Sequence, residues 1–348
     1  MADIANRFNE NPILTPDDIS SSHKCLKVEC LLNPGVFKFQ DKIWLLLRVA
    51  ERPVQKDSII SLPILEDGEV KILEFDKRDP DLDLSDPRII TYKGTTYLTT
   101  LSHLRLVYSG NGIKFTESGY PPIFGEGPAE SYGIEDCRVT QIGKTYYLTY
   151  TAVSESGYGV GMMSTSDWSD FRRYGMIFPC PNKDCAIFPE KINDQYWCLH
   201  RPSGVDIAGN HIWTSTSKDM EYWGKHKCIA RTRKGMWDSE RLGAGAAPIK
   251  TKKGWLEIYH GADANHRYCL GAMLFDLNDP SRVLARSQEP IMEPITNYER
   301  KGFFGNVVFT NGHIVNGDTI TIYYGASDEV ICGATFSIEV IIDTLKLD

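Results

Sequence analysis

Two carboxylates and a guanidinium follow one another near the middle of the chain, in the segment Gly133-Ile134-Glu135-Asp136-Cys137-Arg138. The strand-like run 139–151 comes directly after this segment. A carboxylic acid beside a reacting group can donate a proton, and a guanidinium can hold an anion. Because successive side chains of a strand point to opposite faces, we expect only one of Glu135 and Asp136 to face a shared cavity. The alternative is a solvent-exposed turn in which the Asp caps backbone amides and the Arg pairs locally.

The sequence elements that would position such residues share one pattern, which occurs several times along the chain. Each has two runs of β-branched and aromatic residues joined by a short turn that contains Gly, Asn or Asp, which is typical of a β-hairpin. The sequence predicts six of these hairpins, at 35–39 with 43–49, 86–92 with 95–100, 136–141 with 145–150, 186–191 with 196–200, 247–249 with 255–260, and 306–309 with 319–324.

The spacing of the hairpins is close to the length of a four-stranded propeller blade. We therefore expect an all-β propeller that forms a single domain over residues 1–348, with residues 1–30 as an N-terminal arm. A pair of β-sandwiches is the competing architecture, but hairpins at a fixed period fit a radial array better. In a propeller the first strand of every blade lines a central channel, so side chains far apart in the sequence would meet there.

Composition narrows the class of protein. Hydrophobic residues make up 42% of the 348 residues, which is enough to bury a sizeable core. The formal net charge of -8 and a pI near 5.6 argue against a nucleic-acid surface. We expect neither an export signal nor a membrane span, and hence a cytoplasmic location. The nine cysteines lack paired spacing, so we expect free thiols and no metal site.

The predicted channel would collect ionisable side chains of both signs. Carboxylates that bind hydroxyl groups are typical of a carbohydrate site, in which one carboxyl group can also donate a proton. Cations beside these carboxylates indicate a second, anionic ligand. The residues expected to bind sugar are Arg48, Asp86, Arg88, Glu135, Glu190, Asn306 and Asp328, next to Asp136 and the basic residues Lys191, Arg201 and His260.

The nucleophile decides which residues the chemistry needs. If water attacks the anomeric carbon with inversion, a second carboxylate must act as general base on the face opposite the acid, and Glu190 or Glu240 would serve. If inorganic phosphate attacks, the nucleophile is already an anion at neutral pH. It then needs cations that hold it in line, and no base.

Five motifs resemble, in the same order, those of glycoside hydrolase family 130, the β-mannoside phosphorylases and a few related β-mannosidases. They are Gly-Ile-Glu-Asp-Cys-Arg at 133–138, Ile-Phe-Pro-Glu-Lys-Ile-Asn at 187–193, Leu-His-Arg-Pro at 199–202, Ile-Tyr-His-Gly at 258–261 and Tyr-Tyr-Gly-Ala at 323–326. The resemblance covers nearly the whole chain, from Asn11 to the last hairpin.

This resemblance implies a five-bladed propeller and an inverting mechanism with Asp136 as the proton donor, acting in some members through a sugar hydroxyl. It also implies that phosphate is bound by Lys191, Arg201 and His260, with Tyr259 and Arg138 as further contacts. The alternative is that Lys191, Arg201 and His260 pair with Asp184, Glu190 and Asp263 as ordinary structural ion pairs. Inorganic phosphate is then a co-substrate, and no cofactor is expected. In two respects the sequence departs from the family: Cys137 stands where many members have proline, and the predicted hairpins exceed five blades by one.

The sequence therefore predicts a phosphorylase that converts a β-mannoside and phosphate into α-D-mannose 1-phosphate and a shortened sugar. An inverting β-mannosidase and a sugar-binding propeller without catalysis are the alternatives; the retained cations disfavour the first and Asp136 disfavours the second. The linkage stays open between β-1,2-mannobiose, β-1,4-mannooligosaccharides and mannosyl-N-acetylglucosamine, with general similarity favouring β-1,2. The oligomeric state is also open, a homo-oligomer included.

Overall fold

The computed structural model of the protein describes residues 3–86, 88–204 and 209–345. Most of these residues lie in strands, and the helices are short: η1 (Pro16–Asp18), η2 (Pro128–Glu130), α1 (Asn297–Arg300) and α2 (Ile338–Thr344). No helix in the described ranges is long and apolar enough to cross a membrane. The prediction of an all-β protein is confirmed at the level of secondary structure.

The strands of the described chain form six hydrogen-bonded sheets. The first, an 8-stranded sheet, contains β2 (Leu26–Phe39), β3 (Lys42–Pro53), β9 (Leu101–Ser109), β10 (Thr116–Glu117), β11 (Gly133–Ile142), β12 (Thr145–Ser154), β13 (Gly157–Thr165) and β14 (Arg172–Phe178). A 4-stranded sheet follows, with β15 (Asn182–Ile187), β16 (Tyr196–Pro202), β17 (Ile212–Ser217) and β18 (Trp223–Ala230).

Two more sheets complete the larger part of the molecule. One has 5 strands, β19 (Arg241–Gly243), β20 (Ile249–Lys250), β21 (Trp255–Ala262), β22 (Tyr268–Phe275) and β23 (Val283–Arg286). The other has 4 strands, β1 (Asn6–Arg7), β24 (Val308–Asn316), β25 (Thr319–Ala326) and β26 (Val330–Ser337). The pairing of β1 with β26 places residues from near the two ends of the chain in one sheet.

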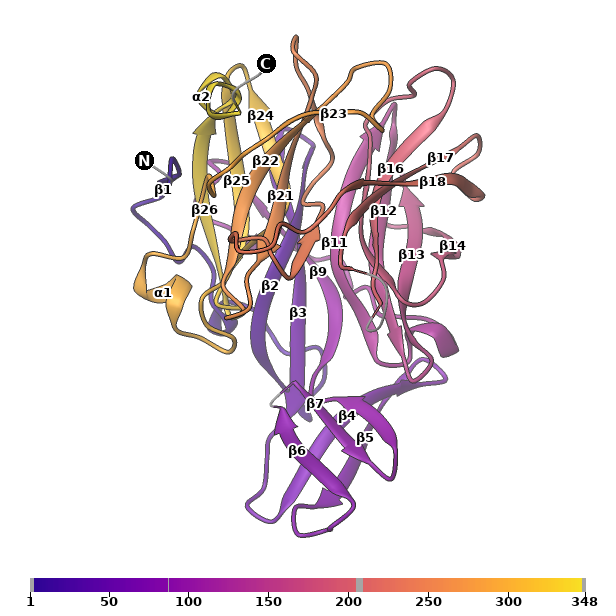
Figure 1. Cartoon of the computed structure of the whole chain (residues 1–348). Helices are drawn as coiled ribbons and strands as arrows, with labels where there is room; N and C mark the ends of the chain where they lie inside the picture. Colours follow the sequence, from indigo (N-terminus) through magenta and orange to yellow (C-terminus); the bar gives the residue numbers. More distant parts are fainter. Residues whose placement is uncertain (1–2, 87, 205–208, 346–348) are drawn as a thin grey trace.

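Two small sheets form a separate lobe, which projects at the bottom of Figure 1. They are the pair β4 (Ile59–Glu66) and β5 (Glu69–Asp76), and the 3-stranded sheet of β6 (Leu82–Asp86), β7 (Ile89–Tyr92) and β8 (Thr95–Leu98). The second predicted hairpin belongs to this lobe and not to the body of the molecule.

All six predicted hairpins are present as antiparallel strand pairs, but the predicted five-bladed propeller was wrong. The sheets have between 2 and 8 strands and are open, so the chain does not divide into five equal blades in its described part. Local sequence patterns predict which neighbouring strands form a hairpin, because a turn fixes that pairing. They do not predict which hairpins join into one sheet.

Two long-range contacts make the 8-stranded sheet. Strand β3 pairs with β9 over Ile43–Glu51, and β11 meets β9 in parallel where Gly133 lies opposite Ser102. Gly133 has a φ of +103°, and a Cβ there would lie 2.3 Å from the carbonyl oxygen of Ser102. Only glycine permits this conformation and this close approach. Gly133 therefore allows β11 to join β9.

The core explains why the sequence of β3 contains a continuous apolar run. Leu45, Leu46 and Leu47 of β3 are each 0% exposed. Leu45 and Leu47 pack with Tyr323 in one cluster, while Leu46 packs with Trp44 in another. Because both faces of β3 are covered, each leucine contributes about 2 kcal/mol through burial, and the strand that carries Arg48 is held rigidly.

Candidate active site

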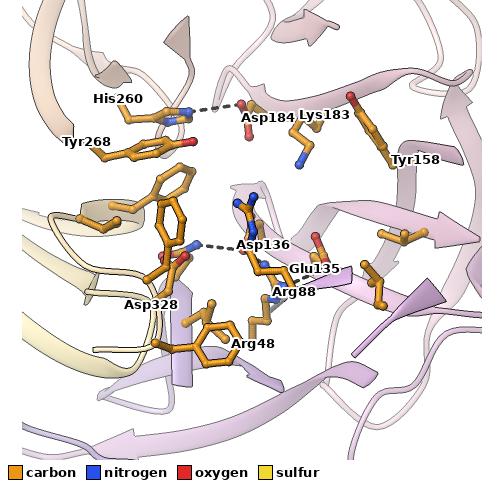
Figure 2. A pocket seen from close by; sticks show the side chains of 18 of the residues that line it. Arg48, Arg88, Glu135, Asp136, Tyr158, Lys183, Asp184, His260, Tyr268 and Asp328 are labelled. Atoms are coloured by element: carbon orange, nitrogen blue, oxygen red, sulfur yellow. Dashed lines mark hydrogen bonds and ion pairs between the residues drawn. The ribbon is translucent and has the colours of Figure 1, made fainter. Parts of the chain in front are cut away.

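The charged side chains gather around a cavity of about 450 Å³, which is large enough for a small oligosaccharide or a similar ligand. Figure 2 shows this cavity from close by. Its ionisable lining consists of Arg48, Arg88, Glu135, Asp136, Lys183, Asp184, Arg201, Arg241, His260 and Asp328. Its aromatic lining consists of Tyr158, Tyr268, Phe303, Phe304 and Phe309. Such a wall offers flat apolar faces beside charged hydrogen-bonding groups.

Both carboxylates of the central motif face the cavity because a β-bulge interrupts β11. The pairing with β12 shifts register between Glu135 and Arg138, and Asp136 has a φ of 51°, in the left-handed region. A bulge breaks the alternation of side chains and re-aims those beside it. The expectation that only one of Glu135 and Asp136 could face the cavity was therefore wrong.

Arg48 of β3 holds these two carboxylates. Its Nη1 donates to Oδ1 of Asp136 at 3.1 Å, its Nη2 donates to Oε1 of Glu135 at 2.8 Å, and its Nε donates to Oγ of Ser102 at 2.9 Å. Nδ2 of Asn33 donates to the same Oδ1 of Asp136 at 3.0 Å. Among the described residues no hydrogen bond reaches the other oxygen of Asp136, Oδ2, which leaves that oxygen available to a ligand.

Two carboxyl groups of the cavity have opposite pKa shifts. Burial disfavours the charged form of Asp136, but the positive charges of Arg48, Arg138 and Lys183 hold the pKa of this carboxyl below its ordinary value. Burial raises the pKa of Asp328 to about 7; Arg48 opposes this shift and the negative charge of Asp136 adds to it. At neutral pH the cavity is thus lined by an ionised Asp136 and an Asp328 that is partly protonated.

On another side of the cavity, Asp184 of β15 contacts basic side chains. Its Oδ1 lies 3.1 Å from Nη2 of Arg138, and its Oδ2 lies 2.8 Å from Nε of Arg201 and 3.3 Å from Nε2 of His260. Burial disfavours the charged form of Asp184, but the contacts with Arg201, His260 and Arg138 hold its pKa well below the ordinary value. Asp184 is therefore a permanent buried anion.

His260 is neutral at neutral pH. Burial lowers its pKa to about 4, although Asp184 pulls in the opposite direction. The ring is 1% exposed and lies against Phe309, with 4.1 Å between ring centroids. From the sequence His260 was expected to be one of the cations around an anion, whereas the structure offers a neutral ring that can donate or accept a hydrogen bond.

The cavity brings together seven of the residues assigned from the sequence, which are Arg48, Arg88, Glu135, Asp136, Arg201, His260 and Asp328. Arg88 reaches the cavity from the lobe, and its guanidinium lies 4.8 Å from the centre of the Phe304 ring. Asp86 is outside the lining but binds Arg88, with Oδ2 at 2.8 Å from Nη2. Asn306 is exposed and also lies outside the lining.

Glu190 and Lys191 are not brought to the cavity. Glu190 pairs with Lys250 at the surface, and Nζ of Lys191 lies over the ring of Tyr196. The strand that carries these two residues was predicted to begin at residue 186, whereas β15 spans Asn182–Ile187. The start of the strand faces the cavity, so residues 183 and 184 line it, and the pair at 190 and 191 falls beyond the other end.

Tyr259 and Arg138, assigned to phosphate, are buried behind the cavity wall. The hydroxyl of Tyr259 donates to Oδ2 of Asp238 at 2.9 Å, and its ring is 0% exposed. Its neighbour His260 faces the cavity instead, because adjacent side chains of β21 point to opposite faces. Arg138 donates to the backbone oxygens of residues 136, 244 and 245 and to Asp184, so it supports the site without lining it.

The sequence did not assign several lining residues to the site, namely Tyr158, Lys183, Arg241 and Tyr268. Asp184 was named only in the alternative, as a structural ion-pair partner of the basic residues, and it does pair with Arg201 and His260. A usable signal existed for Lys183 and Asp184. Lys183-Asp184-Cys185 repeats the pattern of Glu135-Asp136-Cys137 at the start of the next hairpin. In the described ranges no group of three or more His, Cys, Asp or Glu could hold a metal ion.

Residues 86–347 of this chain match the family model of glycoside hydrolase family 130, which is described as β-1,4-mannooligosaccharide phosphorylase. The chain belongs to this family, and the family predicted from its motifs is confirmed. It is 42% identical to the β-1,2-mannobiose phosphorylase of Listeria innocua over 98% of each chain. It is also 42% identical to the 1,2-β-oligomannan phosphorylase of a Thermoanaerobacter species, over 66% of this chain and 77% of that one.

A solved structure extends the likeness to the fold. The β-1,2-mannobiose phosphorylase from Listeria innocua, in complex with β-1,2-mannobiose, superposes with a TM-score of 0.95 and 42% sequence identity. The superposition covers 98% of this chain and 99% of that chain. The whole architecture, lobe included, is thus shared with that phosphorylase.

Proposed function

We propose that this protein cleaves a β-linked mannoside with inorganic phosphate, giving α-D-mannose 1-phosphate and a shortened sugar with inversion. The observation that carries the proposal is the 42% identity over 98% of both chains to a β-1,2-mannobiose phosphorylase, which agrees with the phosphorolysis predicted from the sequence. A second relative acts by its name on 1,2-β-oligomannan. We therefore assign a β-1,2-linked mannobiose or short oligosaccharide as the substrate.

The electrostatics of the cavity support phosphate over water as the nucleophile. Lys183, Arg201 and Arg241 line the cavity and supply fixed positive charge for an anion. Glu190 and Glu240, the carboxylates that hydrolysis was expected to use, do not line it. Asp184 does, but a carboxylate with a strongly lowered pKa is a weak base for activating water.

Asp136 is the proton donor in this proposal, with its free Oδ2 directed to a sugar hydroxyl or to the leaving oxygen. The lowered pKa of Asp136 fits this role once the charge of phosphate is considered. The positive charge of Lys183 is one cause of the lowering. Phosphate beside Lys183 would offset that charge and raise the pKa of Asp136, so the co-substrate would help to protonate the acid.

The test is to incubate the protein with β-1,2-mannobiose and with β-1,4-mannobiose, each with and without phosphate, and to identify the products. We expect α-D-mannose 1-phosphate from the β-1,2 sugar and only in the presence of phosphate. The Asp136→Asn variant is the control for contaminating activity. Release of free mannose at an undiminished rate without phosphate would replace the phosphorylase by a β-mannosidase.

A further inference from the structure

Asp184 occupies the same structural position in β15 that Asp136 occupies in β11. Both residues have a left-handed backbone conformation, with a φ of 51° for Asp136 and 55° for Asp184. Both sit in a β-bulge, since the register of β15 with β16 shifts between Lys183 and Ala186. Each is preceded by a charged residue that lines the cavity and followed by a buried cysteine. The proposed acid thus has a structural counterpart, and the mechanism above gives that counterpart no part in the reaction.

The surroundings of Asp184 indicate what it does. Three basic residues approach it from three different strands, Arg138 from β11, Arg201 from β16 and His260 from β21. The His260 contact is drawn as a dashed line in Figure 2. Arg201 is 7% exposed, and its Nε lies 2.8 Å from Oδ2 of Asp184 in an ion pair that lacks hydrogen-bond geometry. No hydrogen bond of its two Nη groups is found among the described residues, so the donating edge of the guanidinium is available to a ligand.

We propose that Asp184 is a positioning residue that fixes Arg201, and with it His260, in the orientation that receives the phosphate co-substrate. This inference rests on the proposed phosphorolysis. A guanidinium held at Nε keeps its planar edge in one orientation. Without that contact, Arg201 is free to turn toward the other carboxylates of the same cavity, Asp136 and Asp328, which would remove donors from phosphate.

The test is a double-mutant cycle with the KM for phosphate as its main readout. Asp184→Asn keeps the size of the side chain but removes its charge. We expect the KM for phosphate to rise about tenfold or more, with a much smaller change in the KM for the mannoside. In an Arg201→Ala background the same Asp184→Asn change should add little, because the residue that it positions is gone. Simple additivity of the two changes, or an unaltered phosphate KM in Asp184→Asn, would overturn the proposal.

Asp238→Asn is the matched control. Asp238 is a buried aspartate, 0% exposed, that pairs with Arg233 and Arg286 but lies outside the cavity lining. This variant should lose thermal stability while keeping the parent's KM for phosphate. A rise of the same size in Asp238→Asn would show that the effect of Asp184→Asn is merely structural, and would also overturn the proposal.

Crystallography of the parent protein keeps the inference testable if Asp184→Asn does not fold. Crystal structures with and without inorganic phosphate should show Nε of Arg201 against Asp184 in both, with the Nη edge on the anion. An Arg201 that leaves Asp184 to bind phosphate would contradict the inference. Calorimetry with inorganic phosphate alone separates the two proposals: no binding by the parent overturns both, whereas binding with unchanged affinity in Asp184→Asn overturns only the positioning role.

Discussion

The bulges at Asp136 and Asp184 have the same backbone but hold their carboxylates in opposite ways. At Asp136, Arg48 and Asn33 bind only Oδ1, and no described residue binds Oδ2. At Asp184, basic groups lie against both oxygens. A carboxylate with a free oxygen can exchange a proton with a ligand, whereas one surrounded by cations is fixed as an anion. The bulge directs the carboxylate into the cavity, and the residues around the carboxylate determine whether it can exchange a proton.

The residues before the two aspartates differ in charge, and this difference sets the polarity of the cavity. Glu135 brings a second carboxylate to the side of Asp136, where Arg48 holds both. Lys183 brings an ammonium group to the side of Asp184, where its Nζ lies 4.9 Å from the centre of the Tyr158 ring. One motif, repeated with a change of sign, thus makes an acidic side suited to hydroxyl groups and a basic side suited to an anion.

The strongest way to break the comparison is Asp136→Asn. Removing the proposed proton donor should lower turnover on the order of a hundredfold or more, while the fold and the KM for phosphate stay close to those of the parent. Turnover, phosphate KM and the melting temperature are measured on the same preparations. Asp184→Asn serves as the comparison, since it should show the reverse pattern. Near-normal turnover in Asp136→Asn would remove this residue from the mechanism.

Arg201→Lys is a milder change on the basic side. A lysine keeps the charge but cannot bind Asp184 through Nε while presenting a planar pair of donors. We expect the KM for phosphate to rise roughly tenfold, with mannoside KM little changed. The matched control is Arg233→Lys, which alters an arginine that pairs with a buried aspartate outside the cavity. Equal phosphate affinity in Arg201→Lys and the parent would show that a point charge is sufficient at this position.

Asp328→Asn sharpens the comparison with a third carboxyl, through the stability of the protein and not through its kinetics. Because burial raises the pKa of Asp328 to about 7, the folded protein binds a proton there that the unfolded chain has already released. The parent should therefore lose stability relative to Asp328→Asn as the pH rises from about 4 through about 7, by up to about 1.4 kcal/mol per pH unit. Thermal melts of both proteins across this range measure the difference. A constant difference at all pH values would place the pKa of Asp328 near its ordinary value.

The sequence by itself determined the local elements and the acidic half of the site. Alternating β-branched and aromatic runs with Gly, Asn or Asp turns predicted six hairpins that all formed, because a hairpin is specified by residues close together in the chain. The motif around Asp136 and its resemblance to a known family indicated the chemistry. Arg48 and Asp328 were also among the residues expected to bind sugar, and both line the cavity.

Only the tertiary structure decided how the hairpins assemble and which cations face the cavity. Joining β3, β9 and β11 into one sheet depends on the close contact of Gly133 with Ser102, which no local pattern encodes. Glu190 and Lys191 were misplaced because the strand starts four residues earlier than its most apolar stretch suggests, at Asn182. Lys183 and Asp184 face the cavity through a bulge, and a bulge is set by the pairing of two strands, so it is invisible in either strand alone.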